Sequence, residues 1–566
     1  MPQRAIGDAA TTVLGARAAL AGPVPTFDLV VIGGGINGAG IARAAALAGY
    51  TVCLLEARDF GWGTTWRSTK LIHGGLRYLE HAEFGLVFES LRDQALLLRE
   101  YPDLVRPISL LLPVYRGGRH GPLTIGLGLT LYDRLAYGRR LPGHRRLNAA
   151  EAALIEPALA RPGLRGAFQY ADSQAAYPER LALQTLFEAT EAGAICLNHA
   201  EVVGLMSGAG RVGGVIVQDR VRERCVEIPA RAVINAAGPW VDALLATLPR
   251  PPRRQIGGTR GAHLVVDYGG AGPVQALYAE ARSDGRPFFI VPWRGRHLIG
   301  TTDTRYDGPP EAAGATESDV AYLLGEANAL LPAAPLSGAA VQYGYAGVRP
   351  LPVNGAGPAG AITRRHLIRD HAGAGYAGLY SVIGGKLSTF RSLADDALHR
   401  LGPWLGDRRP RTRVDLTSGS SGSTEADAAR WLLNKVGPVT GDHLRALYGP
   451  RLGALARIVK AEPQLLRPLC PHGPDLLGQV VLAAREEAAI TVADVLLRRV
   501  GAGWNGCLGL DCAGRVAERL RLELGWSADE LEQQHEAYAA EVQRTFYRPA
   551  TPGSPPMAAG LNITPQ

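Results

Sequence analysis

The sequence lacks the marks of a secreted, membrane-spanning or zinc-finger protein. It has 6 cysteines in 566 residues and no C-x-x-C pair, which is too few and too scattered for a disulfide framework. Cys507 and Cys512 have the most metal-like spacing, and we interpret them as a buried or incidental pair, so we predict no metal site. No apolar run is long enough to cross a bilayer. Asp8 and Arg17 interrupt the Ala-rich start, so we expect a cytoplasmic chain without a signal peptide.

Lysine is also scarce, because only Lys70, Lys386, Lys435 and Lys460 stand among 60 basic residues. Arginine and lysine differ in shape, hydration and pKa, so each remaining lysine is informative. Two of the four lie in glycine-rich segments. The net charge of +8 permits an anionic partner, but there is no basic stripe with interleaved aromatic residues, so we expect no nucleic-acid partner.

A nucleotide-binding pattern opens the first third of the chain. An apolar strand at 27–32 runs into Gly33, Gly35 and Gly38 in the spacing G-x-G-x-x-G, and a small-residue helix then leads to a second strand ending at Glu56. The glycines let the backbone approach a pyrophosphate at the helix N-terminus, and the acidic residue binds ribose hydroxyls. The pattern therefore predicts a dinucleotide site.

Further glycine-rich fragments recur near residues 74, 238 and 384, between strand-like segments. The fragment "GGKLSTF" at 384–390 places free backbone N–H groups at a helix start, where they stabilise negative charge; tight packing alone is the other explanation of its glycines. A simple NAD enzyme completes its nucleotide domain in one contiguous half of the chain. The interleaved pattern instead suits a long cofactor in an extended groove, and it favours FAD over NAD.

One set of stretches, spread over about residues 27–545, carries a resemblance to a known family: "DLVVIGGGINGAGIA", "STKLIHGGLRYLEH", "VINAAGPWV", "IGTTD", "GVRPL", "AITR", "GGKLSTFR" and "TVADVLLRR". The sequence resembles the FAD-dependent, respiratory type of glycerol-3-phosphate dehydrogenase. The resemblance implies oxidation of sn-glycerol 3-phosphate to dihydroxyacetone phosphate, with hydride transfer to FAD and a quinone as the final acceptor. An imidazole accepts the hydroxyl proton in such a reaction while hydride leaves carbon.

The expected fold class is α/β, with an FAD-binding Rossmann-type domain of the glutathione-reductase or amino-acid-oxidase kind. An antiparallel-sheet substrate domain and an all-helical C-terminal domain complete it, because strand signals dominate residues 165–345 and vanish beyond a Gly/Ser-rich stretch. The expected boundaries are a disordered extension at 1–26, the FAD-dependent oxidoreductase region at 27–409, a linker at 410–425, the helical domain at 426–545 and a disordered tail at 546–566. FAD-binding segments are expected at about 27–80, 165–262 and 345–400.

The resemblance also implies roles for individual residues. Lys70 and His73 would face the flavin, Gly74 and Gly75 would permit close approach, and His263 would be the base. The implied cofactor contacts are Gly33, Gly35, Ile36, Asn37, Gly38, Glu56, Ser68, Lys70, His73, Gly74, Gly75, Leu76, Ala237, Gly238, Gly385, Lys386, Leu387 and Ser388. The implied substrate contacts are Arg77, Tyr78, Arg349, Arg364 and Lys386, and the implied catalytic residues are His263, Arg349 and Lys386.

These residue types suit a phosphorylated polyol, because several fixed cations neutralise a dianion and position it. Without the resemblance, His263 is typical of a structural strand histidine, and Arg349 of a surface ion pair. The chain departs from the family at Trp66 and Arg67, where small polar residues are usual, and at 177–180, "YPER", where an acidic pair before Ala-Arg is common. The departures bear on the choice of substrate and electron acceptor.

Three other functions stay open: an oxygen-using glycerol-3-phosphate oxidase, an amine oxidase of the same flavin fold, and a flavin-binding interaction protein without turnover. An amino acid offers one carboxylate and does not need so many cations. The apolar stretch at 122–138 followed by Arg139, Arg140, Arg145 and Arg146 predicts peripheral contact with the anionic inner face of the cell membrane, with a core helix and a solvated basic loop as the alternative. A monomer and a homodimer are both open.

Overall fold

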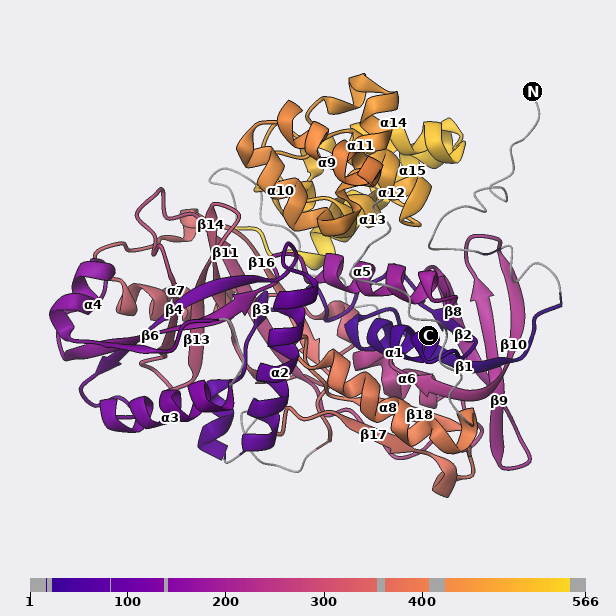
Figure 1. The fold of residues 1–566 in the computed structure, drawn as a ribbon, viewed down its shortest axis with the longest axis horizontal. Helices are drawn as coiled ribbons and strands as arrows, with labels where there is room; N and C mark the ends of the chain where they lie inside the picture. The colour runs from indigo at the N-terminus through magenta and orange to yellow at the C-terminus, as the bar shows by residue number, and fades with distance from the viewer. Residues whose placement is uncertain are drawn as a thin grey trace.

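The computed structural model describes residue 17 and residues 23–81, 83–136, 141–353, 362–406 and 423–549. Most of the expected N-terminal extension, residues 410–422 of the expected linker, residues 550–566 of the expected tail, and Arg139 and Arg140 lie outside these ranges. The described residues form two β-sheets side by side and a helical domain that rests across them (Figure 1).

The first sheet is built around the nucleotide-binding pattern. Its strands run in the order β17-β18-β10-β1-β2-β7, with β9 on β10 and β8 on β9. β1 pairs in parallel with β2 and with β10, and these strands are buried on both faces, as parallel strands between helices are. The strands are β1 (Phe27–Ile32), β2 (Val52–Leu55), β7 (Ile195–Leu197), β8 (Ala200–Gly208), β9 (Arg211–Asp219), β10 (Arg224–Asn235), β17 (Leu367–Asp370) and β18 (Leu379–Ile383).

Small residues pack the helices onto this sheet. Helix α1 (Ile36–Leu47) is rich in alanine and glycine and lies close to α5 (Pro178–Glu191) and α8 (Phe390–Leu405). A Cβ on Gly40 of α1 would lie 2.7 Å from the Phe390 ring, so the contact between α1 and α8 requires glycine there. α6 (Val241–Leu245) follows β10.

The second sheet is mainly antiparallel and contains segments from both sides of the first. Its strands run in the order β15-β11-β14-β13-β12-β4-β6-β3, with β16 on β11 and β5 on β6. β6 falls inside the segment 165–262 that the sequence assigns to FAD binding, yet it belongs to this sheet. The strands are β3 (Leu71–Ile72), β4 (Arg106–Tyr115), β5 (Arg145–Leu147), β6 (Leu164–Gln174), β11 (Thr259–Val266), β12 (Ala276–Glu280), β13 (Pro287–Trp293), β14 (Arg296–Gly300), β15 (Thr304–Arg305) and β16 (Val341–Arg349).

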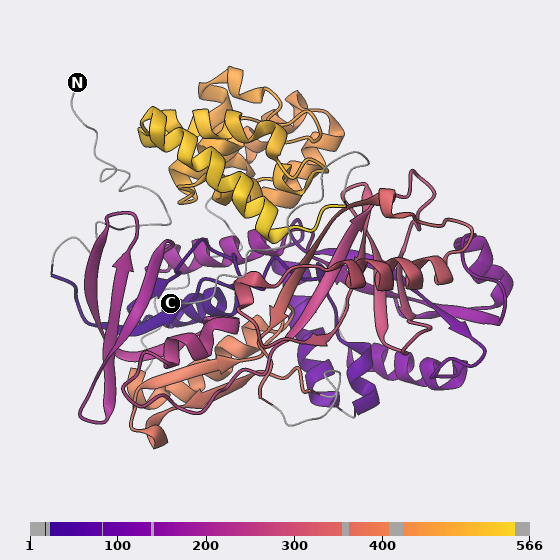
Figure 2. The same ribbon diagram turned by 180° about the vertical axis from the view of Figure 1, so that it is seen from behind.

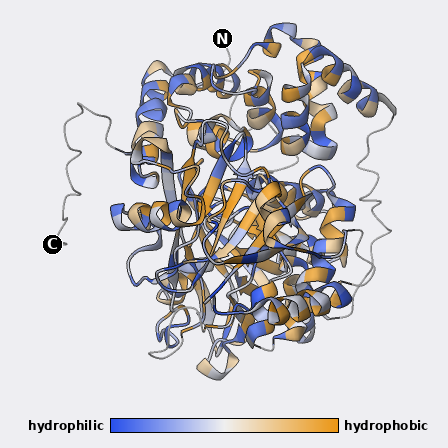
Figure 3. Ribbon diagram, turned by 90° about the vertical axis from the view of Figure 1, so that its left-hand side faces the viewer, coloured by the Kyte–Doolittle hydropathy of each residue, from blue (hydrophilic) through white to orange (hydrophobic). Residues whose placement is uncertain are grey.

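Four helices flank the second sheet: α2 (Phe84–Glu100), α3 (Pro122–Leu135), α4 (Ala149–Ile155) and α7 (Glu317–Leu330). α2 lies between the two sheets (Figure 1). Apolar strands gather in the interior of the molecule, while the helices around them present mixed faces (Figure 3). No described helix is long and apolar enough to cross a membrane.

The C-terminal domain is helical in its described part, as its 3.6-residue periodicity predicts. The capping box expected at Ser527 and Glu530 opens the last helix. The chain then returns to the second sheet, where Tyr547 exchanges two backbone hydrogen bonds with Gly344 of β16 (Figure 2). The helices are α9 (Ser423–Lys435), α10 (Pro438–Tyr448), α11 (Leu452–Ala461), α12 (Gly478–Glu486), α13 (Val492–Asp494), α14 (Leu510–Leu524) and α15 (Ala528–Thr545), with a π-helical turn at Val495–Arg499.

Candidate functional site

The glycine turn after β1 forms a cradle that only glycine fits. Gly33 has φ of 108°, and a Cβ there would lie 2.6 Å from the Ala236 carbonyl oxygen. A Cβ on Gly38 would lie 1.9 Å from the Gly33 carbonyl oxygen. Gly35 caps α1 without a side chain, so the positive end of the helix is open to an anion. These features fit a pyrophosphate group.

Glu56 lies at the end of β2, beside this turn. Its carboxylate accepts hydrogen bonds from the backbone N–H groups of Gly34, at 2.7 Å, and Arg58, at 2.9 Å. Burial raises the pKa of Glu56 above its ordinary value, and the two amide hydrogen bonds oppose that rise. This is the position from which an acidic residue binds ribose hydroxyls.

The segment that carries Gly385, Lys386, Leu387 and Ser388 meets the same helix end. The Asn37 side-chain N–H donates to the Gly384 carbonyl at 3.4 Å, and Asn37 Oδ1 is buried without a partner. Gly384 and Gly385 both have positive φ, and a Cβ on Gly385 would lie 2.6 Å from Asn37. Two segments far apart in sequence therefore lie against each other at the start of α1.

The structure changes the interpretation of the two glycines in "KLIHGGLRYLEH". A Cβ on Gly74 would lie 2.3 Å from the Tyr132 hydroxyl, and one on Gly75 would lie 2.2 Å from the Tyr78 ring. These glycines therefore let two tyrosines of the chain itself approach. His73 follows β3, and burial together with the charge of Lys386 lowers its pKa to about 4, so its imidazole is neutral.

Lys70 differs most from expectation, because its side chain is directed at the helical domain. The ammonium donates to the Trp66 carbonyl at 2.5 Å and lies 4.4 Å from the ring centre of Trp504. The rings of Trp293 and Tyr345 are 5.4 and 5.7 Å away. Burial lowers its pKa to about 8. Cation–π contact holds this ammonium group, so the backbone of Lys70 is the part left to meet a cofactor.

The predicted substrate residues come together. Lys386 Nζ lies 3.8 Å from the ring centre of Tyr78, and the charges of Arg364, Arg77 and Arg349 all act on the Tyr78 hydroxyl. Burial nevertheless raises the Tyr78 pKa above its ordinary value. Burial lowers the pKa of Lys386 to about 7. Four cationic side chains from four separate segments, called the cation cluster below, thus lie around one tyrosine.

Asp303 holds two of these arginines and was missed as a site residue. Arg349 donates to Asp303 Oδ1 at 3.0 Å, and Arg364 donates to Asp303 Oδ2 at 2.9 Å. Arg349 also donates to the Thr301 hydroxyl at 2.9 Å. The two arginines keep the Asp303 pKa below its usual range despite burial. Arg364 Nη1 is buried and has no partner. The stretch "IGTTD" is one of those that carry the family resemblance, but the resemblance gave no role to its aspartate.

His263 lies in β11 beside β14 and β16 and is 2% exposed. Its Nε2 is 2.9 Å from the Thr69 hydroxyl, its ring stacks on Tyr345 with centres 5.1 Å apart, and its Nδ1 is buried without a partner. Burial, with Arg349 and Lys70 nearby, lowers its pKa well below the ordinary value. The imidazole is therefore neutral and able to accept a proton.

The sequence departures face the helical domain. Trp66 packs edge-on against Trp504, and Arg67 lies over the rings of Trp62 and Trp66. Arg180 forms a bidentate ion pair with Glu487 at 2.7 and 2.9 Å. These residues therefore join two domains rather than shape the cation cluster.

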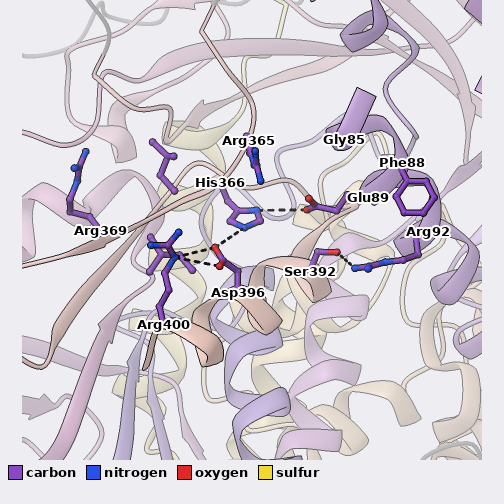
Figure 4. A pocket seen from close by; sticks show the side chains of 12 residues that line it. Gly85, Phe88, Glu89, Arg92, Arg365, His366, Arg369, Ser392, Asp396 and Arg400 are labelled. Atoms are coloured by element: carbon purple, nitrogen blue, oxygen red, sulfur yellow. Dashed lines mark hydrogen bonds and ion pairs between the residues drawn. The ribbon is translucent and has the colours of Figure 1, made fainter. Parts of the chain in front are cut away.

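A cavity of about 750 Å³ lies between α2, β17 and α8 (Figure 4). His366 stands between Glu89 and Asp396, with nitrogen–oxygen distances of 3.8 and 3.4 Å, and Arg92, Arg365, Arg369 and Arg400 surround it. The α2 side of this cavity adjoins the cation cluster, because Lys386 donates to the hydroxyl of Ser90 in α2 at 3.3 Å.

Comparison with known proteins gives two domain matches. Residues 28–390 match the family described as FAD dependent oxidoreductase, which covers most of the chain. The chain belongs to this family. Residues 413–531 match the C-terminal domain of alpha-glycerophosphate oxidase. The FAD-dependent oxidoreductase family confirms the predicted cofactor, and the glycine cradle, Glu56 and the contact of Asn37 with Gly384 fit it.

Individual relatives span nearly the whole length of this FAD-dependent oxidoreductase. A glycerol-3-phosphate dehydrogenase of Synechocystis is 39% identical over 531 residues, covering 90% of this chain and 95% of the relative. Glycerol-3-phosphate dehydrogenase 2 of Mycobacterium tuberculosis is 33% identical, covering 93% and 90%. The solved glycerol-3-phosphate dehydrogenase of Bacillus halodurans complexed with FAD is 28% identical, with a TM-score of 0.73 over 92% and 95% of the two chains. The predicted fold class and family are therefore confirmed.

Proposed function

We propose that this protein oxidises sn-glycerol 3-phosphate to dihydroxyacetone phosphate and passes the electrons to a quinone. The observation that carries the proposal is the cluster of Arg77, Arg349, Arg364 and Lys386. Asp303 pairs with only two of these cations, so the cluster has positive charge left to neutralise a phosphate dianion. The names of the relatives support the same substrate.

The residues divide the work as follows. FAD supplies a hydride acceptor when bound. Arg349 and Arg364, oriented by their shared carboxylate, bind the phosphate through forked N–H groups. His263 Nδ1, the ring nitrogen without a partner, accepts the proton of the substrate hydroxyl while Thr69 fixes the ring through Nε2. Lys386 contributes a point charge, and Tyr78 closes the site beside it.

The cofactor contacts expected from the sequence remain proposals, with Glu56 as the sharpest. Glu56→Ala removes a buried carboxylate that accepts two backbone hydrogen bonds. We expect FAD affinity to fall by about 1–3 kcal/mol, measured by flavin release during dilution. Glu201→Ala, on the exposed edge strand β8, is the control, and equal FAD retention by both variants contradicts the assignment of Glu56.

Anaerobic bleaching of the flavin spectrum tests the substrate. Glycerol 3-phosphate should bleach the oxidised flavin, whereas glycerol and simple amino acids at the same concentration should not. Bleaching by an amino acid alone indicates an amine oxidase. A bound flavin that no candidate substrate reduces indicates a flavin-binding interaction protein.

Oxygen as the acceptor has one specific observation in its favour, the match of the helical domain to that of alpha-glycerophosphate oxidase. Turnover with air as the sole acceptor, followed by peroxide formation, distinguishes the two. For the proposed dehydrogenase, a soluble quinone analogue should reoxidise the reduced flavin much faster than air does.

Peripheral attachment to a membrane is the setting in which a quinone is reached. Helix α3 exposes Leu123 and Leu127 by 82% and 73%, and Phe84 and Phe88 of the adjacent helix α2 are exposed by 48% and 52%. Phe88 also lines the cavity next to the cation cluster. Exposed apolar side chains gathered on adjoining helices are typical of a surface that enters a lipid interface.

Leu127→Ser in α3 should reduce co-sedimentation with vesicles of anionic phospholipid. Val439→Ser in α10, which removes an equally exposed valine from the helical domain, should not. Replacing Arg145 and Arg146 by glutamate should release the protein as well, because both side chains are exposed. Unchanged binding by both Leu127→Ser and the Arg145 and Arg146 double variant contradicts the membrane surface.

A further inference from the structure

A second group of chemically reactive side chains lies in the helical domain, apart from the cation cluster. Cys470 and His472 come from the loop before α12, Cys507 from the turn before α14, and Asp511 from the first turn of α14. Ligand atoms of His472, Cys507 and Asp511 all lie within 4.8 Å of one another. The Cys470 sulfur is 3.8 Å from the Cys507 sulfur. His472 Nε2 is 2.7 Å from Asp511 Oδ2.

The distance between the Cys470 and Cys507 sulfurs can be compared with that in a disulfide and that between two thiolates on a zinc ion. A disulfide needs about 2.05 Å between the sulfurs. Two thiolates on one tetrahedral zinc ion, each bonded at about 2.3 Å, stand about 3.8 Å apart. The observed 3.8 Å is far longer than a disulfide and equals the spacing on zinc, which is also the distance of an ordinary thiol–thiol contact. Thiolate, imidazole and carboxylate are also the ligand types that zinc takes from proteins.

Backbone N–H groups are directed at both sulfurs. The His472 amide N–H is directed at the Cys470 sulfur, and the amide N–H groups of Gly509 and Asp511 are directed at the Cys507 sulfur. Such donors stabilise negative charge on a ligating sulfur. Cys512 also contacts the Cys470 sulfur, and its thiol donates to the Gly509 carbonyl at 3.3 Å.

A comparison within the molecule strengthens this choice. Asp59, His199 and Asp494 also bring three ligand atoms within 4.8 Å of one another. However, the guanidinium groups of Arg498 and Arg499 already hold Asp59 at 2.5 and 2.7 Å. Two cations occupy the place of a metal there. No arginine or lysine is ion-paired to Asp511 among the described residues. Its one ion-pair partner there is His472, which is charged only when its imidazole is protonated.

We propose that His472, Cys507 and Asp511 bind a zinc ion, and that Cys470, whose sulfur contacts only the Cys507 side chain among them, turns in as the fourth ligand, although the sequence spacing alone predicts no metal site. The site is structural in type, with four protein ligands and none left for chemistry. The metal would close two loops onto the start of α14. A Cβ on Gly473 would lie 2.7 Å from the Asn505 amide, so the loops already touch. Asn505 accepts from Arg294 at 2.8 Å, and neighbouring Trp504 covers the Lys70 ammonium.

Metal analysis of the flavin-loaded full-length protein tests the proposal. We expect about one zinc per chain, retained after gel filtration. After chelation, Co²⁺ should restore the site and produce the visible ligand-field and near-ultraviolet bands of a cysteine-ligated tetrahedral cobalt ion. Cys507→Ser and His472→Ala should weaken Co²⁺ binding at least about tenfold. Cys225→Ser, an exposed cysteine of β10, and Cys512→Ser should bind as the parent protein does.

Two controls keep the test decisive. His472 and its partner Asp511 are about half exposed, so His472→Ala leaves the core intact, and its flavin content reports whether the variant has folded. Adding Zn²⁺ to metal-free parent protein should raise its thermal unfolding temperature, and adding it to His472→Ala should not. Absence of cobalt bands in a folded parent protein overturns the proposal. Titration of four rather than six free thiols in denaturant with a chelator, where bound metal no longer protects cysteines, would also do so, since it would reveal a disulfide.

Discussion

Two clusters of basic side chains in this molecule differ in burial and in how their charge is balanced. Between the domains, Arg180, Arg498 and Arg499 meet Glu487, Asp59 and Asp494, and each guanidinium has a carboxylate within 2.9 Å. In the cation cluster of Arg77, Arg349, Arg364 and Lys386, only Arg349 and Arg364 pair with a carboxylate among the described residues, and they share that of Asp303.

The difference separates a structural contact from a binding site. A buried charge without its counterion is costly, and a fully paired cluster avoids that cost in the folded chain itself. An incompletely paired cluster is stabilised when an anion arrives. Net charge within a cluster therefore distinguishes the residues that join the domains from those that we assign to the substrate.

The largest effect is expected in the balanced cluster. Asp59→Asn leaves Arg498 and Arg499 without their shared carboxylate, and breaking such a buried pair costs about 3–5 kcal/mol of unfolding free energy. Urea unfolding followed by tryptophan fluorescence measures it. Asp307→Asn breaks the exposed pair with Arg254 and should cost less than about 1 kcal/mol. Equal costs would remove the distinction between the two kinds of ion pair.

Arg349→Lys in the cation cluster should reduce kcat/KM for glycerol 3-phosphate about ten- to hundredfold, or about 1.5–3 kcal/mol, although the substitution conserves the charge. Lysine cannot reproduce the forked contacts to Asp303 and Thr301. Steady-state kinetics with an artificial acceptor should also show a smaller preference over unphosphorylated glycerol. Arg254→Lys is the matched control. A mutant that keeps the full preference shows that Arg349 does not bind the phosphate.

A pH profile tests the charge of Lys386. Because its pKa is lowered to about 7, raising the pH through 7 removes its proton and its attraction for a dianion. We expect kcat/KM to fall about tenfold per pH unit above that value. The neutral His263, whose pKa is lowered, adds no acidic limb near pH 6. In Lys386→Arg the limb should vanish, since guanidinium stays charged; a limb that persists unchanged belongs to another group.

The smallest effect is expected from Glu89, whose charge raises the pKa of Lys386 from the cavity side. Glu89→Gln removes that charge, so the limb should move to lower pH by less than about one unit. Asp396→Asn, in the same cavity but beside Arg400, should leave the limb in place. A shift to higher pH in Glu89→Gln would reverse the assigned sign.

The sequence predicted those parts of the site that local chain geometry determines. Gly33, Gly38 and Glu56 lie within one strand–turn–helix–strand unit, so spacing alone places them. His263 and Arg349 needed the family resemblance, because a lone strand residue carries no sign of its neighbours. The aromatic surroundings of the Lys70 ammonium group were not predicted, since Trp504 reaches it from the far end of the chain. Asp303 was missed because a carboxylate among phosphate-binding cations looks unfavourable until the arginines it orients are seen.

The residues that surround Lys70 are synthesised at very different times. Lys70 and the loop that follows it leave the ribosome early, while Trp504, which covers the ammonium group, leaves it late. Tyr547, which completes the edge of β16, comes later still. The ribosome therefore synthesises the predicted cofactor-binding segment long before Trp504 and Tyr547, which pack against Lys70 and complete the edge of β16. A fragment ending before the helical domain would expose an apolar surface around a half-desolvated lysine, which is a surface that chaperones bind.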